Sequence, residues 1–159
     1  MSSDDQQIRE IRVHPIENGT VIDHINAGQA LNVLKILNIP TSSSRVVSVL
    51  INAPSIHGRK DVVKIEGREL NVEEVDKIAL IAPNATINII RNFEVSEKDI
   101  VHIHSQIEGV VRCINPNCIS NSNEPVTSKF AVSSNGRRTI LRCSYCERII
   151  SDDIGEHLL

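Results

Sequence analysis

The sequence has no Trp, one Tyr and two Phe among its 159 residues, so its core must be packed from Ile, Val and Leu. It has no apolar run near the roughly 18 residues that a membrane-spanning helix requires. Its polar and acidic start, MSSDDQQIRE, is unlike a signal peptide. These absences predict a cytoplasmic protein with no membrane partner, and the length suits one domain or two small ones.

The chain also lacks an excess of positive charge. Its formal net charge is -3, and acidic and basic residues are balanced in the part beyond residue 104. Proteins that bind a phosphate backbone usually carry a strong basic excess, and those that bind single strands use stacking aromatics. We therefore expect no nucleic-acid partner, and keep a zinc-ribbon adaptor that binds nucleic acid as the alternative.

Cysteine is absent until Cys113, and then all four cysteines fall in two short runs. Cys113 and Cys118 are spaced C-x4-C, and 24 residues later Cys143 and Cys146 are spaced C-x2-C. Two close pairs on separate turns can place four thiolates tetrahedrally around Zn²⁺. In a reducing cytoplasm this pattern favours a metal over disulfides. A site closed by four thiolates leaves no open position for water, so the zinc is predicted to be structural.

Other interpretations of these cysteines are free thiols, two local disulfides, or a redox pair at Cys143 and Cys146. Redox chemistry of the thioredoxin type requires such a pair at a helix N-terminus. Here the pair lies between two strand-like segments. His102 and His104 are possible ligands, but four cysteines already complete the site. The two histidines are better explained as alternating residues of a strand.

The hydrophobic pattern predicts two domains. A first domain is expected over residues 1–103, with a mobile arm at 1–9, and a small all-β zinc domain over 104–159, with the junction near 96–106. The first domain is predicted to be ferredoxin-like, with the order βαββαβ, which makes the fold class α+β. Its expected elements are strand 19–25, helix 26–40, strands 44–52 and 59–67, helix 70–84 and strand 85–95.

Two features support the helices. Apolar residues recur at helical spacing in the first helix, and Pro40 ends it. In the second helix Asn71 is a plausible N-cap, with Glu74 in the capping-box position. In the first strand, alternation places Val21 and Ile25 together with Asp23 on one face.

Several charged residues lie within or next to the predicted strands, where a purely structural core would have apolar residues. Asp23 and His24 are in the middle of a strand, Lys60 and Lys64 share one strand face, and Lys98 follows the last strand. Lysines on one face can contact phosphates, although the pattern alone favours a solvated face with an internal ion pair. There is no Gly-rich phosphate loop and no linked nucleophile and base, so no catalytic activity is predicted.

Several segments occur in a specific order: GTVIDHI, GRKDVVKIEG, DKIALIAPNATIN, NCIS followed by EPVTSKFAV, and LRCSYCE. Together they closely resemble the regulatory chain of aspartate carbamoyltransferase, from about Val13 to Ile150. The resemblance implies a non-catalytic subunit whose first domain, over 1–103, is an allosteric domain that binds nucleoside triphosphates, and whose zinc domain contacts the catalytic chain. It also implies a regulatory-chain homodimer and a dodecamer of two catalytic trimers and three regulatory dimers, which makes carbamoyl aspartate for pyrimidine synthesis.

The resemblance carries site residues over by position. Asp23 would face the ribose, His24 and Lys98 the phosphates, and Lys64 the base or ribose. The zinc ligands would be the four cysteines. The full set of expected nucleotide contacts is Val13, Ile16, Asp23, His24, Lys60, Lys64, Asn88, Ile90, Phe93, Val95 and Lys98.

Two positions depart from the family pattern. Phe93 stands where the best-known members have Tyr, which changes little if the base is held by backbone atoms. Glu10 stands where they have Lys, and an acidic group there would disfavour a second triphosphate or would demand Mg²⁺.

Overall fold

The structure is a computed structural model that describes residues 15–39, 45–135 and 138–159. The first part forms β1 (Gly19–Asn26), α2 (Ala30–Ile36), β2 (Val47–Ser55), β3 (Gly58–Glu66), α3 (Val72–Ile81), β4 (Thr86–Arg91) and β5 (Glu94–Ile100). The second part forms β6 (Gln106–Glu108), the 3₁₀ turn η1 (Ile119–Asn121), β7 (Lys129–Asn135), β8 (Arg138–Cys143), β9 (Ile149–Ile150) and the 3₁₀ turn η2 (Ile154–His157).

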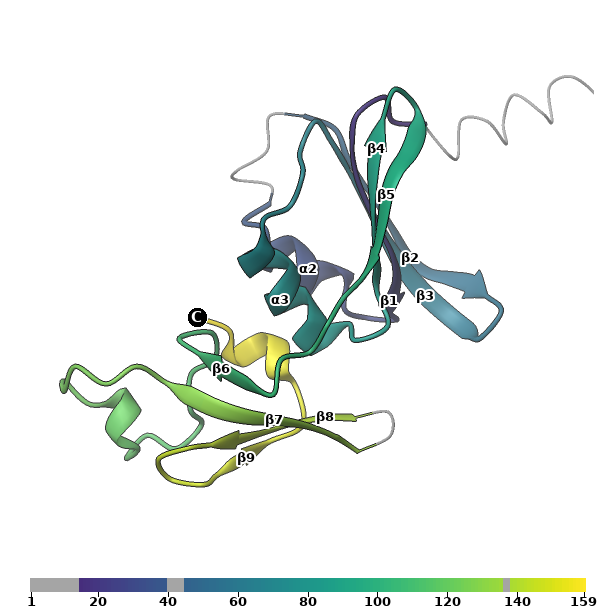
Figure 1. Ribbon diagram of the computed structural model, residues 1–159. Helices are drawn as coiled ribbons and strands as arrows, with labels where there is room; N and C mark the ends of the chain where they lie inside the picture. The colour runs from purple at the N-terminus through teal and green to yellow at the C-terminus, as the bar shows by residue number, and fades with distance from the viewer. Residues whose placement is uncertain (1–14, 40–44, 136–137) are drawn as a thin grey trace, which may run out of the picture.

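The first part is a five-stranded antiparallel sheet in the order β2-β3-β1-β4-β5, and both helices lie on one face of it (Figure 1). The strands β2-β3-β1-β4 with α2 and α3 reproduce the predicted ferredoxin-like order. The second part is a smaller sheet in the order β6-β7-β8-β9. The α+β fold class is thereby confirmed. In the described part of the chain, neither helix has the length and apolar character needed to span a bilayer.

The core of the first part lies between the helices and one face of the sheet. Ile22, Val63 and Ile87 project from three adjacent strands and are buried. They pack with the predicted helical stripes, whose buried members are Ala30, Val33, Leu37, Ile78, Ala79 and Ala82. The opposite face of the sheet carries no helix in the described residues (Figure 1), and we call it the open face.

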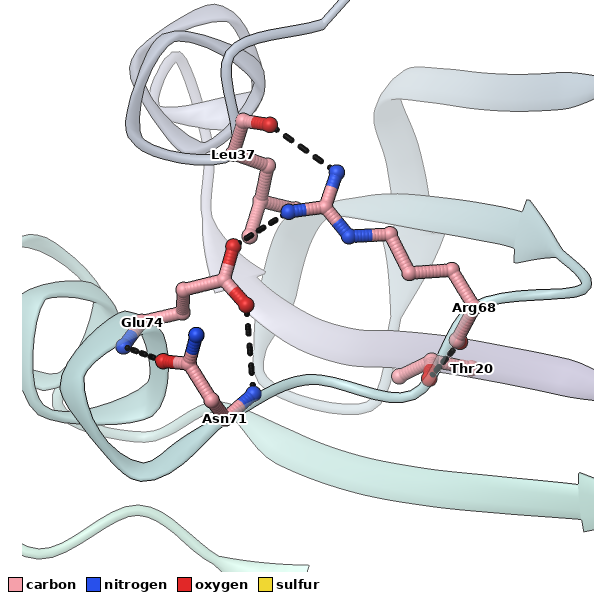
Figure 2. Close-up of polar contacts among 5 residues, drawn as sticks. All are labelled: Thr20, Leu37, Arg68, Asn71 and Glu74. Atoms are coloured by element: carbon pink, nitrogen blue, oxygen red, sulfur yellow. Dashed lines mark hydrogen bonds and ion pairs between the residues drawn. The ribbon is translucent and has the colours of Figure 1, made fainter. Parts of the chain in front are cut away.

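The predicted capping box begins α3. The Glu74 N–H donates to Asn71 Oδ1 at 2.9 Å, and the Asn71 N–H donates to Glu74 Oε1 at 3.1 Å. Figure 2 shows that Glu74 also pairs with Arg68, which donates to the Leu37 carbonyl at the end of α2 at 2.9 Å. Thr20 donates to the Arg68 carbonyl at 2.6 Å. The segment after β3 is therefore tied to both helices and to β1.

The predicted strand over 85–95 proves to be two strands. Asn92 and Phe93 have φ values of 53° and 65°, and they form a tight turn from which β5 runs back along β4. Lys98 therefore lies within β5 and does not follow the last strand. The junction is correspondingly shorter than predicted and spans 101–105, between β5 and β6.

The predicted facing of β1 is correct up to Asp23 and wrong beyond it. His24 has a φ of 56°, and the register with β3 shifts between Ile22 and Ile25. This β-bulge inserts one residue, so Ile25 turns to the helix-covered face and is fully buried. A second bulge interrupts β2 between Leu50 and Ala53, where Asn52 has a φ of 61°.

The C-terminal segment returns to the first part of the chain. η2 packs against α3 (Figure 1), and a Cβ at Gly155 would lie only 2.6 Å from Asn32 Nδ2 on α2. A β-bridge joins Val111 to Leu158 and anchors this segment to the second part. We call the contact of η2 with α2 and α3 the seam. It joins the two parts through side chains and backbone in close packing.

Candidate functional site

The four cysteines form one cluster in the second part. Their sulfur atoms all lie within 4.8 Å of one another. Cys113 Sγ is 3.5 Å from Cys146 Sγ, and Cys118 Sγ is 3.7 Å from Cys143 Sγ. A tetrahedron with metal–sulfur bonds of about 2.3 Å has edges of about 3.8 Å. The sulfurs are therefore spaced for one metal ion, and a disulfide would need them at about 2.05 Å.

Two turns hold the cysteines in place. In the first, the Cys118 N–H donates to the Asn115 carbonyl at 3.0 Å, and Asn121 Nδ2 donates to that carbonyl at 2.7 Å and to the Cys113 carbonyl at 2.9 Å. In the second, the Cys143 N–H donates to the Arg148 carbonyl at 2.9 Å, between β8 and β9. The redox pair would require a helix start after Cys143, and the structure has a turn between strands there.

The thiols have different acidities. Burial raises the pKa of the Cys113 thiol to about 12, and burial also raises the pKa of Cys143. At Cys146 a hydrogen bond from the Arg148 N–H lowers the pKa to about 6. A metal cation would stabilise the thiolate form of every ligand, and its binding would release protons. The chemistry of these donors fits a closed, structural metal site.

The two histidines near the junction do not belong to this cluster. Among the described residues, the only grouping of ligand atoms suited to a metal consists of the cysteines. His104 Nε2 lies 3.0 Å from Asp76 Oδ1 on α3, so it links the junction to the first part. His102 is exposed. Both histidines lie in the junction between β5 and β6, and not in a strand as the alternation predicted.

The open face brings together part of the predicted nucleotide set. Lys64 pairs with Val21, Val21 with Asn88, and Asn88 with Lys98, so these residues form one row across β3, β1, β4 and β5. Residues paired across strands point to the same face. Lys64 and Asn88 are half-buried and Lys98 is exposed. Two ammonium groups and an amide are thus presented on one surface.

A second group lies at the β1 bulge. Lys60 Nζ pairs with Asp23 Oδ1 at 2.9 Å, which confirms the internal ion pair that the pattern favoured. His24 Nδ1 lies 2.8 Å from Thr86 Oγ1, and the backbone N–H of His24 donates to Asp23 Oδ1 at 2.7 Å. Burial raises the pKa of Asp23, but the hydrogen bonds from Lys60 and the His24 N–H outweigh it, so the pKa lies below its ordinary value.

The other predicted contacts are distributed more widely. Ile90 and Val95 are paired across β4 and β5. Phe93 lies in the turn with a 62% exposed side chain, and Ile16 is half-buried before β1. Val13 and Glu10 lie outside the described residues, as does the arm over 1–9.

A hollow of about 670 Å³ adjoins the bulge. Its size is within the range of small-molecule sites. It is lined by His24, Ile25, Asn26, Ala27, Ser55, His57, Arg59, Lys60 and Asn84. Sequence reasoning did not include Ser55, His57, Arg59 or Asn84. The clearest signal for Ser55, His57 and Arg59 was the pair of basic side chains within SIHGR, next to Lys60.

The fold and the cysteine cluster define a two-part protein, with one sheet that presents charged groups on its open face and a second part whose four cysteines are spaced to hold a metal. Comparison with known families agrees. Residues 11–102 match the family described as the allosteric domain of the aspartate carbamoyltransferase regulatory chain, and residues 105–156 match its metal binding domain.

Proteins with similar sequences are regulatory chains of aspartate carbamoyltransferase. The aspartate carbamoyltransferase regulatory chain of Methanococcoides burtonii is 97% identical over 159 residues, which is all of both chains. That of Methanocella arvoryzae is 63% identical over 95% of this chain and 97% of its own, and that of Methanosarcina barkeri is 59% identical over the same shares. The chain belongs to the family of aspartate carbamoyltransferase regulatory chains.

Membership in this family defines the role of the chain. The chain is a non-catalytic, allosteric subunit whose partner is the catalytic chain of aspartate carbamoyltransferase, an enzyme of the pyrimidine pathway. Its second part holds a structural metal in the four-cysteine cluster. The comparisons do not support the alternative of a nucleic-acid adaptor.

Proposed function

We propose that the open face binds a nucleoside triphosphate, and that this ligand is the allosteric effector. The observation that carries the proposal is the row of Lys64, Val21, Asn88 and Lys98 across four strands. A triphosphate needs cations that remain accessible, and a base and sugar need polar and apolar groups nearby. The row offers all of these on one surface.

The contacts follow from this placement. Lys98, exposed on β5, would meet the phosphates together with His24, and Asp23 would accept from a ribose hydroxyl. Val95, which is exposed and paired with the buried Ile90, supplies apolar surface in the neighbouring row. Lys60 is held by Asp23, so it would act on the ligand through that pair or exchange partners when a phosphate arrives.

We further propose that the metal is zinc. Four sulfur ligands in a closed tetrahedral arrangement suit Zn²⁺, and the separations of 3.5 and 3.7 Å fit its bond length. Zinc would cross-link the two turns, and the part of the chain beyond residue 103 would depend on it. This part is small, and domains of such size commonly need a metal or disulfides.

The same role suggests an assembly and a division of the chain. We place the domain boundary at 103–104, because the larger sheet ends at Ile100 and the smaller sheet begins at Gln106. The expected assembly is a regulatory dimer within a cytoplasmic dodecamer of two catalytic trimers and three regulatory dimers. Four free cysteines are in keeping with a reducing compartment.

The test is a binding titration. The chain is assembled with its catalytic partner and titrated with ATP, CTP and UTP by calorimetry, with and without Mg²⁺. The proposal predicts saturable binding of at least one triphosphate, and weaker binding of the matching nucleoside. The absence of binding for all three, in an assembly with a full complement of metal, would refute it.

A further inference from the structure

Asp61 is a fully buried carboxylate in the middle of β3. Its Oδ1 accepts from the Asn52 N–H at 2.8 Å. Its Oδ2 accepts from the Gly28 N–H at 2.9 Å and the Ala30 N–H at 3.0 Å. One side chain therefore holds three backbone groups, from the bulge of β2 and from the turn that leads into α2.

Asp61 lies directly behind the proposed nucleotide site. Adjacent strand residues point to opposite faces, so Lys60 points to the open face, where it pairs with Asp23. Asp61 itself is paired in register with Ile25, immediately after the β1 bulge at His24. If a ligand displaced that bulge, the backbone paired with Asp61 would move with it.

The turn that Asp61 holds continues to the seam. The Gln29 N–H donates to the Asn26 carbonyl at 3.0 Å, and Asn32 Nδ2 donates to Gln29 Oε1 at 2.9 Å. The Asn32 side chain lies against Gly155, where even a methyl group would collide with it at 2.6 Å. The seam therefore begins one helical turn from the groups that Asp61 anchors.

We propose that Asp61 is a positioning residue that couples the nucleotide site to the seam, and this rests on the proposed function. The carboxylate fixes the α2 entry turn to the strand that carries Lys60. A change at the bulge therefore moves the turn, Gln29 and Asn32 as one unit against Gly155. A ligand shifts an equilibrium only if it distinguishes two states, and this unit is the element that both sites contact.

The test replaces Asp61 by Asn in the assembly with the catalytic partner. Asparagine keeps one acceptor oxygen and puts an NH₂ group where the other was, so the N–H groups on that side lose their acceptor. Calorimetry gives the nucleotide Kd for ATP, CTP and UTP, and enzyme assays give the aspartate concentration at half-saturation with and without saturating nucleotide. Asp99→Asn, an exposed aspartate in β5 of the same sheet, is the matched control.

For Asp61→Asn we expect a nucleotide Kd within about threefold of wild type. An allosteric effector typically changes the affinity for the second ligand by about 5- to 150-fold. In Asp61→Asn, the factor by which nucleotide changes the half-saturating aspartate concentration should be less than about a third of the wild-type factor. Asp99→Asn should keep both values. A full wild-type change in Asp61→Asn, at saturating nucleotide, would overturn the coupling role and leave the proposed function intact.

A second variant covers the case in which Asp61→Asn fails to fold. Gly155→Ala alters none of the proposed nucleotide contacts, and the atoms nearest to the added methyl group are those of the Asn32 side chain. It should bind nucleotide as wild type does and show a reduced change in half-saturating aspartate. An unreduced change would overturn the route through the seam. A wild-type assembly that binds none of the three nucleotides would overturn the proposed function, and this inference with it.

Discussion

Replacing Lys98 by Gln should weaken triphosphate binding by removing one accessible positive charge from the open face. The Gln side chain is one atom shorter than Lys and keeps a hydrogen-bond donor, so the main change is the loss of the charge. Lys98 is exposed and lies on β5, an edge strand of the larger sheet. We therefore expect the fold and the metal content to be unchanged.

The magnitude follows from the exposure of the site. Two unit charges about 4 Å apart interact by about 1 kcal/mol in bulk water and by about 4 kcal/mol near a protein surface with an effective dielectric constant of about 20. Lys98 is exposed, so the lower part of that range applies. A loss of about 1–1.5 kcal/mol corresponds to a Kd raised roughly 5- to 13-fold.

Calorimetry on the assembly, at low and high salt, measures this effect. The loss should shrink as salt rises, because exposed charges are screened. It should be absent for the matching nucleoside, which has no phosphate. Lys35→Gln is the matched control, because Lys35 is also exposed but lies on α2, on the other face of the sheet. Equal losses for nucleoside and triphosphate, or equal losses in the two variants, would refute the placement of the phosphates.

Two further predictions concern the metal and the ion pair. Cys118→Ser should remove most of the bound metal, unfold the part beyond residue 103 and prevent assembly with the catalytic chain, because metal binding and folding are linked. Metal analysis and gel filtration measure these effects. Normal assembly without metal would contradict the prediction. Lys60→Met should lower the free energy of unfolding by about 1 kcal/mol or less near neutral pH. Because the folded-state pKa of Asp23 lies below its ordinary value of about 3.9, this difference should be complete above that value and vanish as the pH falls through the folded-state pKa. Urea titrations at several pH values measure the difference, and one that stays constant at acid pH would contradict the prediction.

Sequence reasoning was most successful where a local pattern has one physical solution. The capping box of Asn71 and Glu74 needs only neighbouring residues, and the structure shows both of its hydrogen bonds. The paired cysteines likewise need only two turns and a shared centre. The βαββαβ order followed from hydrophobic periods of two and 3.6 residues along the chain.

The errors arose at backbone features that alternation does not reveal. His24 and Asn52 adopt positive φ values within strands, and each shifts the following residues by one position. Asn tolerates this conformation well, but neither residue is Gly, which would have been a clear signal. The turn at Asn92 and Phe93 was missed for the same reason, and with it the strand that carries Lys98.

Asp61 was overlooked although the pattern held a clue. In RKDVVKIEG, alternation places Asp61 on the same face as Val63 and Ile65, which are buried. A buried carboxylate is costly unless it accepts hydrogen bonds. Its three backbone donors come from segments far apart in the sequence, so only the folded structure shows what stabilises it.

A nucleotide on the open face is expected to alter how the catalytic partner binds aspartate. The most direct measurement is the aspartate saturation curve of the catalytic chain, alone and assembled with this chain, each with and without ATP, CTP or UTP. At least one nucleotide should shift the curve of the assembly and leave the catalytic chain alone unaffected. Identical curves with and without all three nucleotides in the intact assembly would refute an effector site on the open face.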